Sequence, residues 1–238
     1  MKRKCSERIV TKNKKTKLDV PHIFQKKNSA ECGLACVYMI LKNFGVDIDI
    51  EQLRKEIKIT DRGTYAPQLA NYLVEHGFNV KIIGFNPWLF SNFDFNMPKY
   101  LLKKRFRDEL SFLKKKKRKD KEKITCIEHY LKFLDNGGNI KIKIPKKEDI
   151  QKSINNGLPI ISLMTSSFLF GDIDFNFHFN VVTGYNKNYL FVNDPLQEYE
   201  GCKDKKIPID QFLFGIHSSC FNCYDNGSII IAQPNKLI

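Results

Sequence analysis

The chain has 238 residues, of which 42% are hydrophobic, enough for one substantial core, and no pattern divides it into two folding halves. The formal net charge of +14 is concentrated in two segments. No window approaches the roughly 18 apolar residues of a membrane span, and the basic N-terminus is not followed by the apolar segment of a secretion signal, which argues against membrane and exported classes.

Counting charges by segment shows where the basicity lies. Residues 1–19 carry eight Lys/Arg against two acids, and residues 99–123 carry thirteen against four. We therefore expect a basic flexible tail (1–19) and a single domain (20–238) with a helical, Lys-rich insertion at about 86–135. Both basic segments could contact an anionic surface or nucleic acid, or could act as solvated spacers.

The seven cysteines are odd in number and scattered. This usage argues against a disulfide framework and favours a reducing compartment, so we expect a cytoplasmic protein.

Apolar periodicity predicts the elements in chain order. Helices are expected at 33–44, 49–57, 67–76, 101–113, 124–134 and 146–156, with a further turn of helix at 210–214. Strands are expected at 79–85, 139–144, 159–163, 177–185, 189–193, 207–209 and 228–233, and a loop at 86–97. Helices come first and antiparallel strands later, which indicates an α+β domain.

Cys32 lies at the N-terminus of the first predicted helix. Free N–H groups and the positive end of the helix dipole favour a thiolate there, and the thiolate is the reactive form of cysteine. Gln25, seven residues upstream, could direct its amide at the oxygen of an attacked carbonyl, with the Cys32 N–H as a second donor. The alternative is that Cys32 is a small buried apolar residue.

His178 and Asp194 lie on two strands that form a predicted hairpin. If this hairpin is symmetric about Lys187, paired residue numbers add to 374, and Asp194 falls opposite Asn180 on the same face as His178. Diagonal neighbours across strands are roughly 7–8 Å apart, so the carboxylate could orient the imidazole as a base. A slip of the register to 375 would place the two side chains on opposite faces. Otherwise His178 is a core residue and Asp194-Pro195 a turn.

These residues form an ordered set that resembles a known family. The set consists of Gln25, Cys32-Gly-Leu-Ala-Cys-Val-Tyr-Met-Ile, His178-Phe-Asn-Val-Val-Thr-Gly-Tyr and Val192-Asn-Asp-Pro. It is similar to the bacteriocin-processing (double-glycine) cysteine peptidases and their stand-alone peptidase-like relatives, over residues 20–85 and 139–233. The resemblance implies a papain-like α+β fold, with the N-terminal helices packed on a C-terminal antiparallel sheet.

The resemblance also implies roles for four residues. Cys32 would be the nucleophile, His178 the general base, Asp194 its orienting acid and Gln25 the oxyanion donor. The expected activity is cleavage of a peptide or isopeptide bond in a peptide or protein substrate, without a metal or cofactor. The chain departs from the family at Glu31, where the family often has Asp, and in its long segment at 86–135.

Two further function classes remain open. The same fold pattern resembles proteins described as soluble guanylyl cyclases, which open with a similar Val-Pro-His-Ile segment, but no phosphate-binding glycine loop or pair of metal-holding aspartates stands out. The chain could also be a catalytically inactive binding module of this fold, acting through its basic segments. Cys36 could be a second redox thiol but fits a core position better, and His217, Cys220 and Cys223 have only half the spacing of a zinc site.

Overall fold

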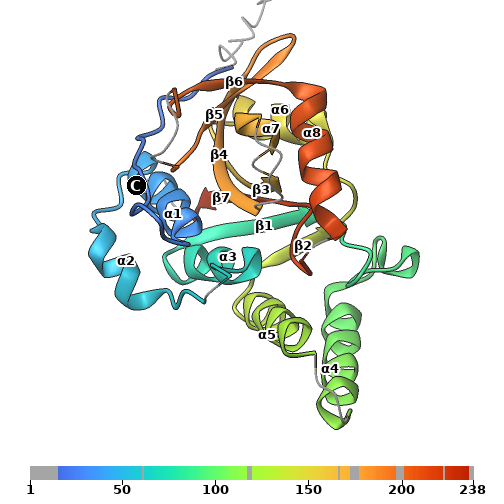
Figure 1. Cartoon of the computed structure of the whole chain (residues 1–238). Coiled ribbons are helices and arrows are strands. Elements are labelled where there is room, and N and C mark those ends of the chain that lie inside the picture. Colours follow the sequence, from blue (N-terminus) through green and yellow to red (C-terminus); the bar gives the residue numbers. More distant parts are fainter. Residues whose placement is uncertain are drawn as a thin grey trace, which may run out of the picture.

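The computed structural model describes residues 16–60, 62–116, 120–165, 167–171, 177–196, 201–221 and 223–235. A curved seven-stranded sheet forms its centre, and in Figure 1 α1 to α3 gather on one side of it and α6 to α8 on the other. The helices are α1 (Cys32–Asn43), α2 (Ile50–Glu56), α3 (Ala66–Glu75), α4 (Lys99–Lys115), α5 (Lys121–Asp135), α6 (Lys147–Asn155), α7 (Ser167–Phe170) and α8 (Ile209–Ser218), with 3-10 turns η1 (Asn92–Asp94) and η2 (Ser219–Phe221). The strands are β1 (Phe78–Gly84), β2 (Asn139–Ile142), β3 (Ile160–Thr165), β4 (Phe177–Tyr185), β5 (Tyr189–Asn193), β6 (Lys205–Pro208) and β7 (Ser228–Pro234).

The α+β prediction is confirmed, and one detail of the sheet differs from it. The strand order is β2-β1-β7-β3-β4-β5-β6, so β1 and β2 join the C-terminal strands through β7. β1 and β2 run parallel, whereas the other described pairs are antiparallel. A parallel pair needs a long crossover connection, and the chain between β1 and β2 supplies it with α4 and α5.

Two helices differ from expectation. α8 continues to Ser218 rather than ending at 214, because Phe212, Gly215 and Ile216 extend its buried face at helical spacing. α7 was not predicted, since four residues carry too little periodicity to be recognised.

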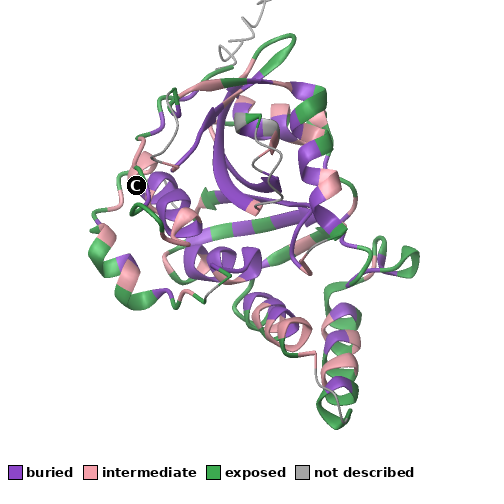
Figure 2. Cartoon of the chain, in the orientation of Figure 1, coloured by how far each residue is buried: buried purple, intermediate pink, exposed green. Residues whose placement is uncertain are grey.

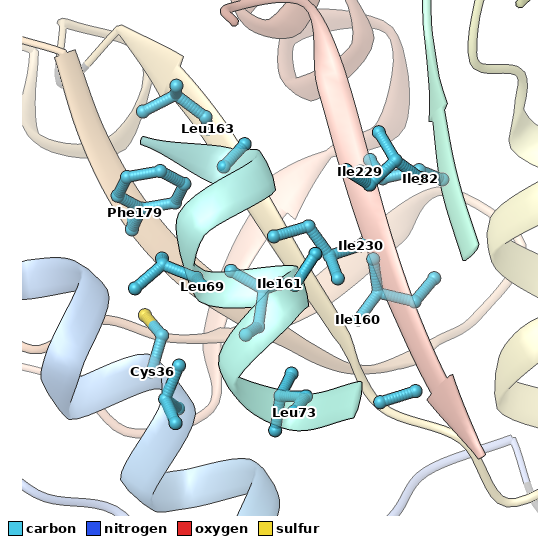
Figure 3. Packing of buried hydrophobic residues seen from close by; sticks show 14 of the residues in the cluster. Cys36, Leu69, Leu73, Ile82, Ile160, Ile161, Leu163, Phe179, Ile229 and Ile230 are labelled. Atoms are coloured by element: carbon cyan, nitrogen blue, oxygen red, sulfur yellow. The ribbon is translucent and has the colours of Figure 1, made fainter. Parts of the chain in front are cut away.

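The hydrophobic core fills the space between the sheet and the helices. Figure 2 shows the central strands and the inner faces of α1 and α3 as buried, whereas the outer face of α4 is exposed. Cys36 is fully buried in this core, in one cluster with Leu69 and Ile161 (Figure 3), and burial raises the pKa of its thiol well above the usual value. Cys36 is therefore a packing residue.

The predicted tail ends earlier than residue 19. The Leu18 N–H donates to the Thr183 carbonyl at 2.8 Å, and the Tyr185 N–H donates to the Thr16 carbonyl at 2.8 Å. Leu18 is buried, and Lys17 pairs with Asp204 at 2.9 Å. Residues 16–18 thus lie along β4, where burial of Leu18 in the core stabilises them, and residues 1–15 of the expected tail fall outside the described part.

The insertion forms a hairpin of α4 and α5 that extends from the body of the domain (Figure 1). α5 packs on α3 and on β2, while α4 packs on α5. Phe90, Phe106 and Tyr130 form its aromatic interior, with ring centroids 5.7–5.9 Å apart. In the described residues, no helix combines the length and apolar character needed to cross a bilayer.

Candidate active site

Cys32 is the first residue of α1, as the sequence predicts. Its side chain is half-buried, and no side-chain hydrogen bond caps this helix at Glu31. Gly33 permits close packing at this point, since a Cβ there would lie 2.2 Å from Thr64 Oγ1 and 2.8 Å from Leu69 Cδ1. The N-terminus of α1 therefore packs closely against the segment that leads into α3. The first N–H groups of a helix have no acceptor within the helix, so those of α1 can bind a ligand.

His178 and Asp194 form a buried hydrogen-bonded pair. His178 Nε2 lies 2.9 Å from Asp194 Oδ1, and both side chains are buried. The same oxygen accepts the Leu196 N–H at 2.9 Å, which holds the carboxylate in place. The other ring nitrogen of His178 remains for Cys32, which lies close enough for its charge to raise the pKa of the imidazole.

The register of the β4–β5 hairpin determines this pairing. Val181 pairs with Asn193 and Val182 with Val192, so residue numbers add to 374 near the site, as predicted. Near the turn, Gly184 pairs with Phe191 and the numbers add to 375. A β-bulge between Val182 and Gly184 separates the two registers. Without this bulge the turn-end register would continue, and His178 and Asp194 would lie on opposite faces.

Contacts from inside and outside the hairpin surround the bulge. The Thr183 hydroxyl shares its hydrogen between the Phe191 carbonyl at 3.3 Å and Asp204 Oδ1 at 3.2 Å, and the Thr183 carbonyl accepts the Leu18 N–H. Gly184 has no Cβ to clash with residue 17, whose Cα would be 2.8 Å from one. The N-terminal segment therefore helps to set the register of the site.

The electrostatics favour an ion pair between Cys32 and His178. Burial alone would raise the pKa of the Cys32 thiol, but the positive charge of His178, its hydrogen bond and a backbone hydrogen bond from Phe179 lower it below the usual value. Burial would lower the pKa of His178, but the charges of Asp194 and Cys32 and the hydrogen bonds to both raise it to about 10. The pair therefore favours thiolate and imidazolium over two neutral groups.

Gln25 is held next to the Asp194 segment. Its backbone N–H donates to the Pro195 carbonyl at 2.8 Å, and its side-chain Nε2 donates to the Ser29 carbonyl at 2.6 Å. The side chain is 7% exposed, and within the described residues its Oε1 has no hydrogen-bond partner. An amide has two N–H groups, so the bond to Ser29 fixes its orientation and leaves one donor.

Two residues that the sequence did not identify connect these segments. His22 Nε2 lies 2.7 Å from the Asp194 carbonyl, and Asn193 Nδ2 donates to the Val20 carbonyl at 3.1 Å. Together with the bond from Gln25 to Pro195, they attach residues 20–25 to residues 193–195. In the sequence, the only indication of this role is that Asn193 directly precedes Asp194.

The side chains of the three weaker zinc candidates contact other groups and not one another. His217 Nε2 contacts the Pro145 carbonyl at 3.0 Å, Cys220 Sγ the Phe85 carbonyl at 3.2 Å, and Cys223 Sγ donates to Glu122 Oε1 at 3.1 Å. Across the ranges that the structure describes, no group of three or more His, Cys, Asp or Glu residues is placed to hold a metal ion.

The site combines a half-buried cysteine at a helix start, an imidazole near it and a buried carboxylate bound to that imidazole. In a papain-like α+β fold, this combination defines a cysteine-peptidase-like protein. Comparison with family models agrees. Residues 20–107 match the model of the peptidase C39 family, and residues 112–226 match that of the peptidase C39-like family. The two matches together span most of the chain, which is therefore similar to the C39 and C39-like peptidases along most of its length.

Three solved structures are similar to the chain, and the first of them, with a TM-score above 0.5, shares the fold. A C39-like peptidase from Bacillus anthracis is 15% identical, with a TM-score of 0.52, covering 92% of this chain and 96% of that one. A double-glycine-motif protease from an AMS/PCAT transporter, in complex with its leader peptide, is 19% identical, with a TM-score of 0.47 and coverages of 92% and 94%. The peptidase domain of Streptococcus ComA, a bifunctional ABC transporter of a quorum-sensing pathway, is 15% identical, with a TM-score of 0.46 and coverages of 90% and 98%.

No curated protein matches the sequence. The guanylyl-cyclase alternative finds no support in the family matches, since both models describe peptidases.

Proposed function

We propose that this chain is a thiol peptidase that hydrolyses a peptide or isopeptide bond with Cys32 as nucleophile, His178 as acid and base, and Asp194 as the orienting carboxylate. The observation that carries the proposal is the buried hydrogen-bonded pair of His178 and Asp194 together with a half-buried cysteine at the start of α1, and the lowered pKa of that thiol agrees with it. A cysteine with only a packing role would have a raised pKa, because burial alone disfavours the thiolate.

The proposed reaction follows from the protonation states. The Cys32 thiolate attacks the carbonyl carbon and forms a C–S bond, while charge develops on the carbonyl oxygen. The C–N bond then breaks, and the leaving amine takes its proton from the His178 imidazolium. Water attacks the thioester, gives its proton to the now neutral His178 and releases the acid, which restores the thiolate. Asp194 stabilises the imidazolium and fixes its tautomer throughout.

We assign the oxyanion site to the Cys32 N–H and the free N–H of the Gln25 amide. The Ser29 carbonyl already orients this amide, so it needs little reorganisation when the tetrahedral intermediate forms. The backbone hydrogen bond from Gln25 to Pro195, which supports this assignment, keeps Gln25 beside the segment that carries Asp194.

Gln25→Ala is expected to lower kcat by about 10²–10³-fold, because one preorganised donor to the oxyanion is lost. Alkylation of Cys32 by iodoacetamide should proceed at the normal rate, since the ion pair is intact. Gln52→Ala, on the surface of α2, is the matched control. Steady-state kinetics on any cleaved peptide checks the prediction, and an unchanged kcat would remove Gln25 from the site.

The insertion gives the proposed enzyme a means of selecting substrates. Arg62 pairs with Glu122 at the start of α5, and the Tyr65 and His129 rings lie 5.3 Å apart. The segment containing Arg62 and Tyr65 also approaches the start of α1, since a Cβ at Gly63 would lie 3.4 Å from the Ala30 carbonyl. We propose that the hairpin borders the substrate path through this segment.

The function is tested by incubating the purified chain with a peptide mixture of diverse sequence and identifying new termini by mass spectrometry. We expect cleavage at neutral pH that stops when Cys32 is alkylated. Absence of cleavage in both peptide and folded-protein mixtures, with Cys32 fully reactive, would favour a binding module of the same fold.

A further inference from the structure

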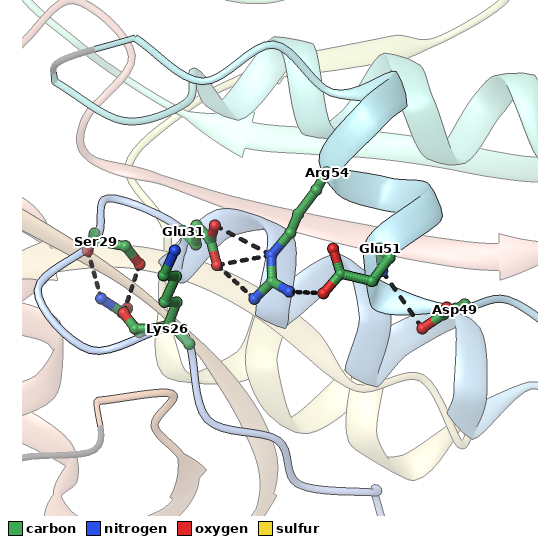
Figure 4. A network of polar contacts seen from close by, with 7 residues as sticks. Lys26, Ser29, Glu31, Asp49, Glu51 and Arg54 are labelled. Carbon is green, nitrogen blue, oxygen red and sulfur yellow. Dashed lines mark hydrogen bonds and ion pairs between the residues drawn. The ribbon is translucent and has the colours of Figure 1, made fainter.

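Glu31 directly precedes the proposed nucleophile and occupies the N-cap position of α1, yet it does not cap the helix. Arg54, on the neighbouring α2, binds its carboxylate instead (Figure 4). Arg54 Nε lies 3.1 and 3.2 Å from the two carboxylate oxygens, and Nη2 lies 2.8 Å from Oε2. Both side chains are largely buried, with 13% of Glu31 and 26% of Arg54 exposed.

Arg54 is itself held from a second direction. Its Nη1 binds Glu51, one turn earlier on α2, and the Asp49 side chain caps that helix by accepting the Glu51 N–H at 3.4 Å. The guanidinium therefore has a fixed place, and its planar fork matches a carboxylate in a way that an ammonium does not.

An unrestrained Glu31 carboxylate would have a competing partner. The free N–H groups and positive dipole at the start of α1 attract a carboxylate from the N-cap residue. Glu31 and Gln25 line the same cavity of about 480 Å³, so there is space for the side chain to reorient. A carboxylate at these N–H groups would occupy the proposed oxyanion site and place a negative charge next to the thiolate.

We propose that Arg54 is a positioning residue that holds the Glu31 carboxylate away from the N-terminus of α1, which keeps the Cys32 N–H free and its thiolate stable. The proposal rests on the function proposed above for Cys32. The other ionisable groups near the thiol are His178, Asp194 and Cys36, and none of them contacts Arg54 in the described interactions. The charged groups that line the cavity with Glu31 are Lys26, Lys27, Glu51 and Arg54, and of these Arg54 binds its carboxylate.

The experiment measures by mass spectrometry how the rate of iodoacetamide alkylation of Cys32 depends on pH. The proteins compared are the wild type, Arg54→Met, Arg54→Lys, Glu31→Gln and the double variant Glu31→Gln/Arg54→Met. Arg107→Met, which removes an exposed arginine that pairs with Asp135, is the matched control. We expect the alkylation midpoint of Arg54→Met to rise by about half a pH unit or more, because the freed carboxylate opposes the thiolate. Arg54→Lys should lie between it and the wild type.

The double variant distinguishes positioning from simple structural support. With glutamine at position 31 there is no charge to restrain, so the double variant and Glu31→Gln should both show the wild-type midpoint. On a cleaved peptide, kcat should fall about tenfold in Arg54→Met, with little change in KM, and recover in the double variant. Wild-type behaviour of Arg54→Met, or a double variant as impaired as Arg54→Met, would overturn the proposal.

Alkylation does not require peptide hydrolysis. A wild-type chain that cleaves no peptide would therefore contradict the proposed function, while the alkylation profiles would still decide the role of Arg54.

Discussion

Cys32→Ala is expected to abolish peptide cleavage, with a loss of about 10⁴-fold or more in kcat, because the thioester can no longer form. The variant should fold normally, since Cys32 is only half-buried and alanine is a good helix former at the first position of α1. The measurement is a cleavage assay together with a thermal unfolding curve, so that loss of chemistry is separated from loss of structure.

The matched control for this variant is Cys223→Ser. Cys223 is also half-buried, but burial and the nearby carboxylates of Asp225 and Glu122 raise the pKa of its thiol, so it should contribute nothing to cleavage. Full activity of Cys32→Ala would exclude Cys32 as the nucleophile. Loss of activity in Cys223→Ser alone would move the proposed chemistry to the other half-buried thiol.

Asp194→Asn is expected to lower kcat/KM at neutral pH by about 10²–10⁴-fold and to shift the alkaline limb of the pH profile downwards. The negative charge of Asp194 raises the pKa of His178 to about 10 against the opposing effect of burial, so removing that charge lowers the pKa. His178 then loses its proton at a lower pH, and the imidazolium that should protonate the leaving amine disappears sooner. An asparagine amide also offers its own N–H to Nε2, which favours the wrong tautomer.

The pH dependence of kcat/KM checks this prediction, with Asp210→Asn, an exposed carboxylate at the start of α8, as control. The wild type should keep its activity well above pH 8, whereas Asp194→Asn should not. A uniform loss across the whole pH range, with an unmoved alkaline limb, would mean that Asp194 supports the fold and does not tune His178.

The elements that carry the site were predictable because their signals are local. The apolar spacing after Cys32 predicts α1, and the alternation on either side of Lys187 predicts both strands of the hairpin with their observed limits. The pairing at the site also followed from the assumed symmetry. The predicted register is correct at the site only because the bulge between Val182 and Gly184 compensates for the different register at the turn.

Features that depend on distant segments were not predictable. The N-terminal residues 16–18 lie beside the bulge, and the parallel pairing of β1 with β2 depends on how α4 and α5 cross between them. The pairing of Glu31 with Arg54 joins two helices whose relative position is set by core packing. In each case one partner is specified by three-dimensional contacts that leave no periodic pattern in the sequence.

The central claim is that Cys32 and His178 form a thiolate–imidazolium pair, and the most direct test is the titration of thiolate absorbance near 240 nm in the wild type minus Cys32→Ala. We predict that the difference signal is present at neutral pH, with a midpoint below the ordinary thiol value of about 8.5, and that it is lost at neutral pH in His178→Ala. A midpoint at or above the ordinary value, or a signal unaffected by removal of His178, would contradict the account.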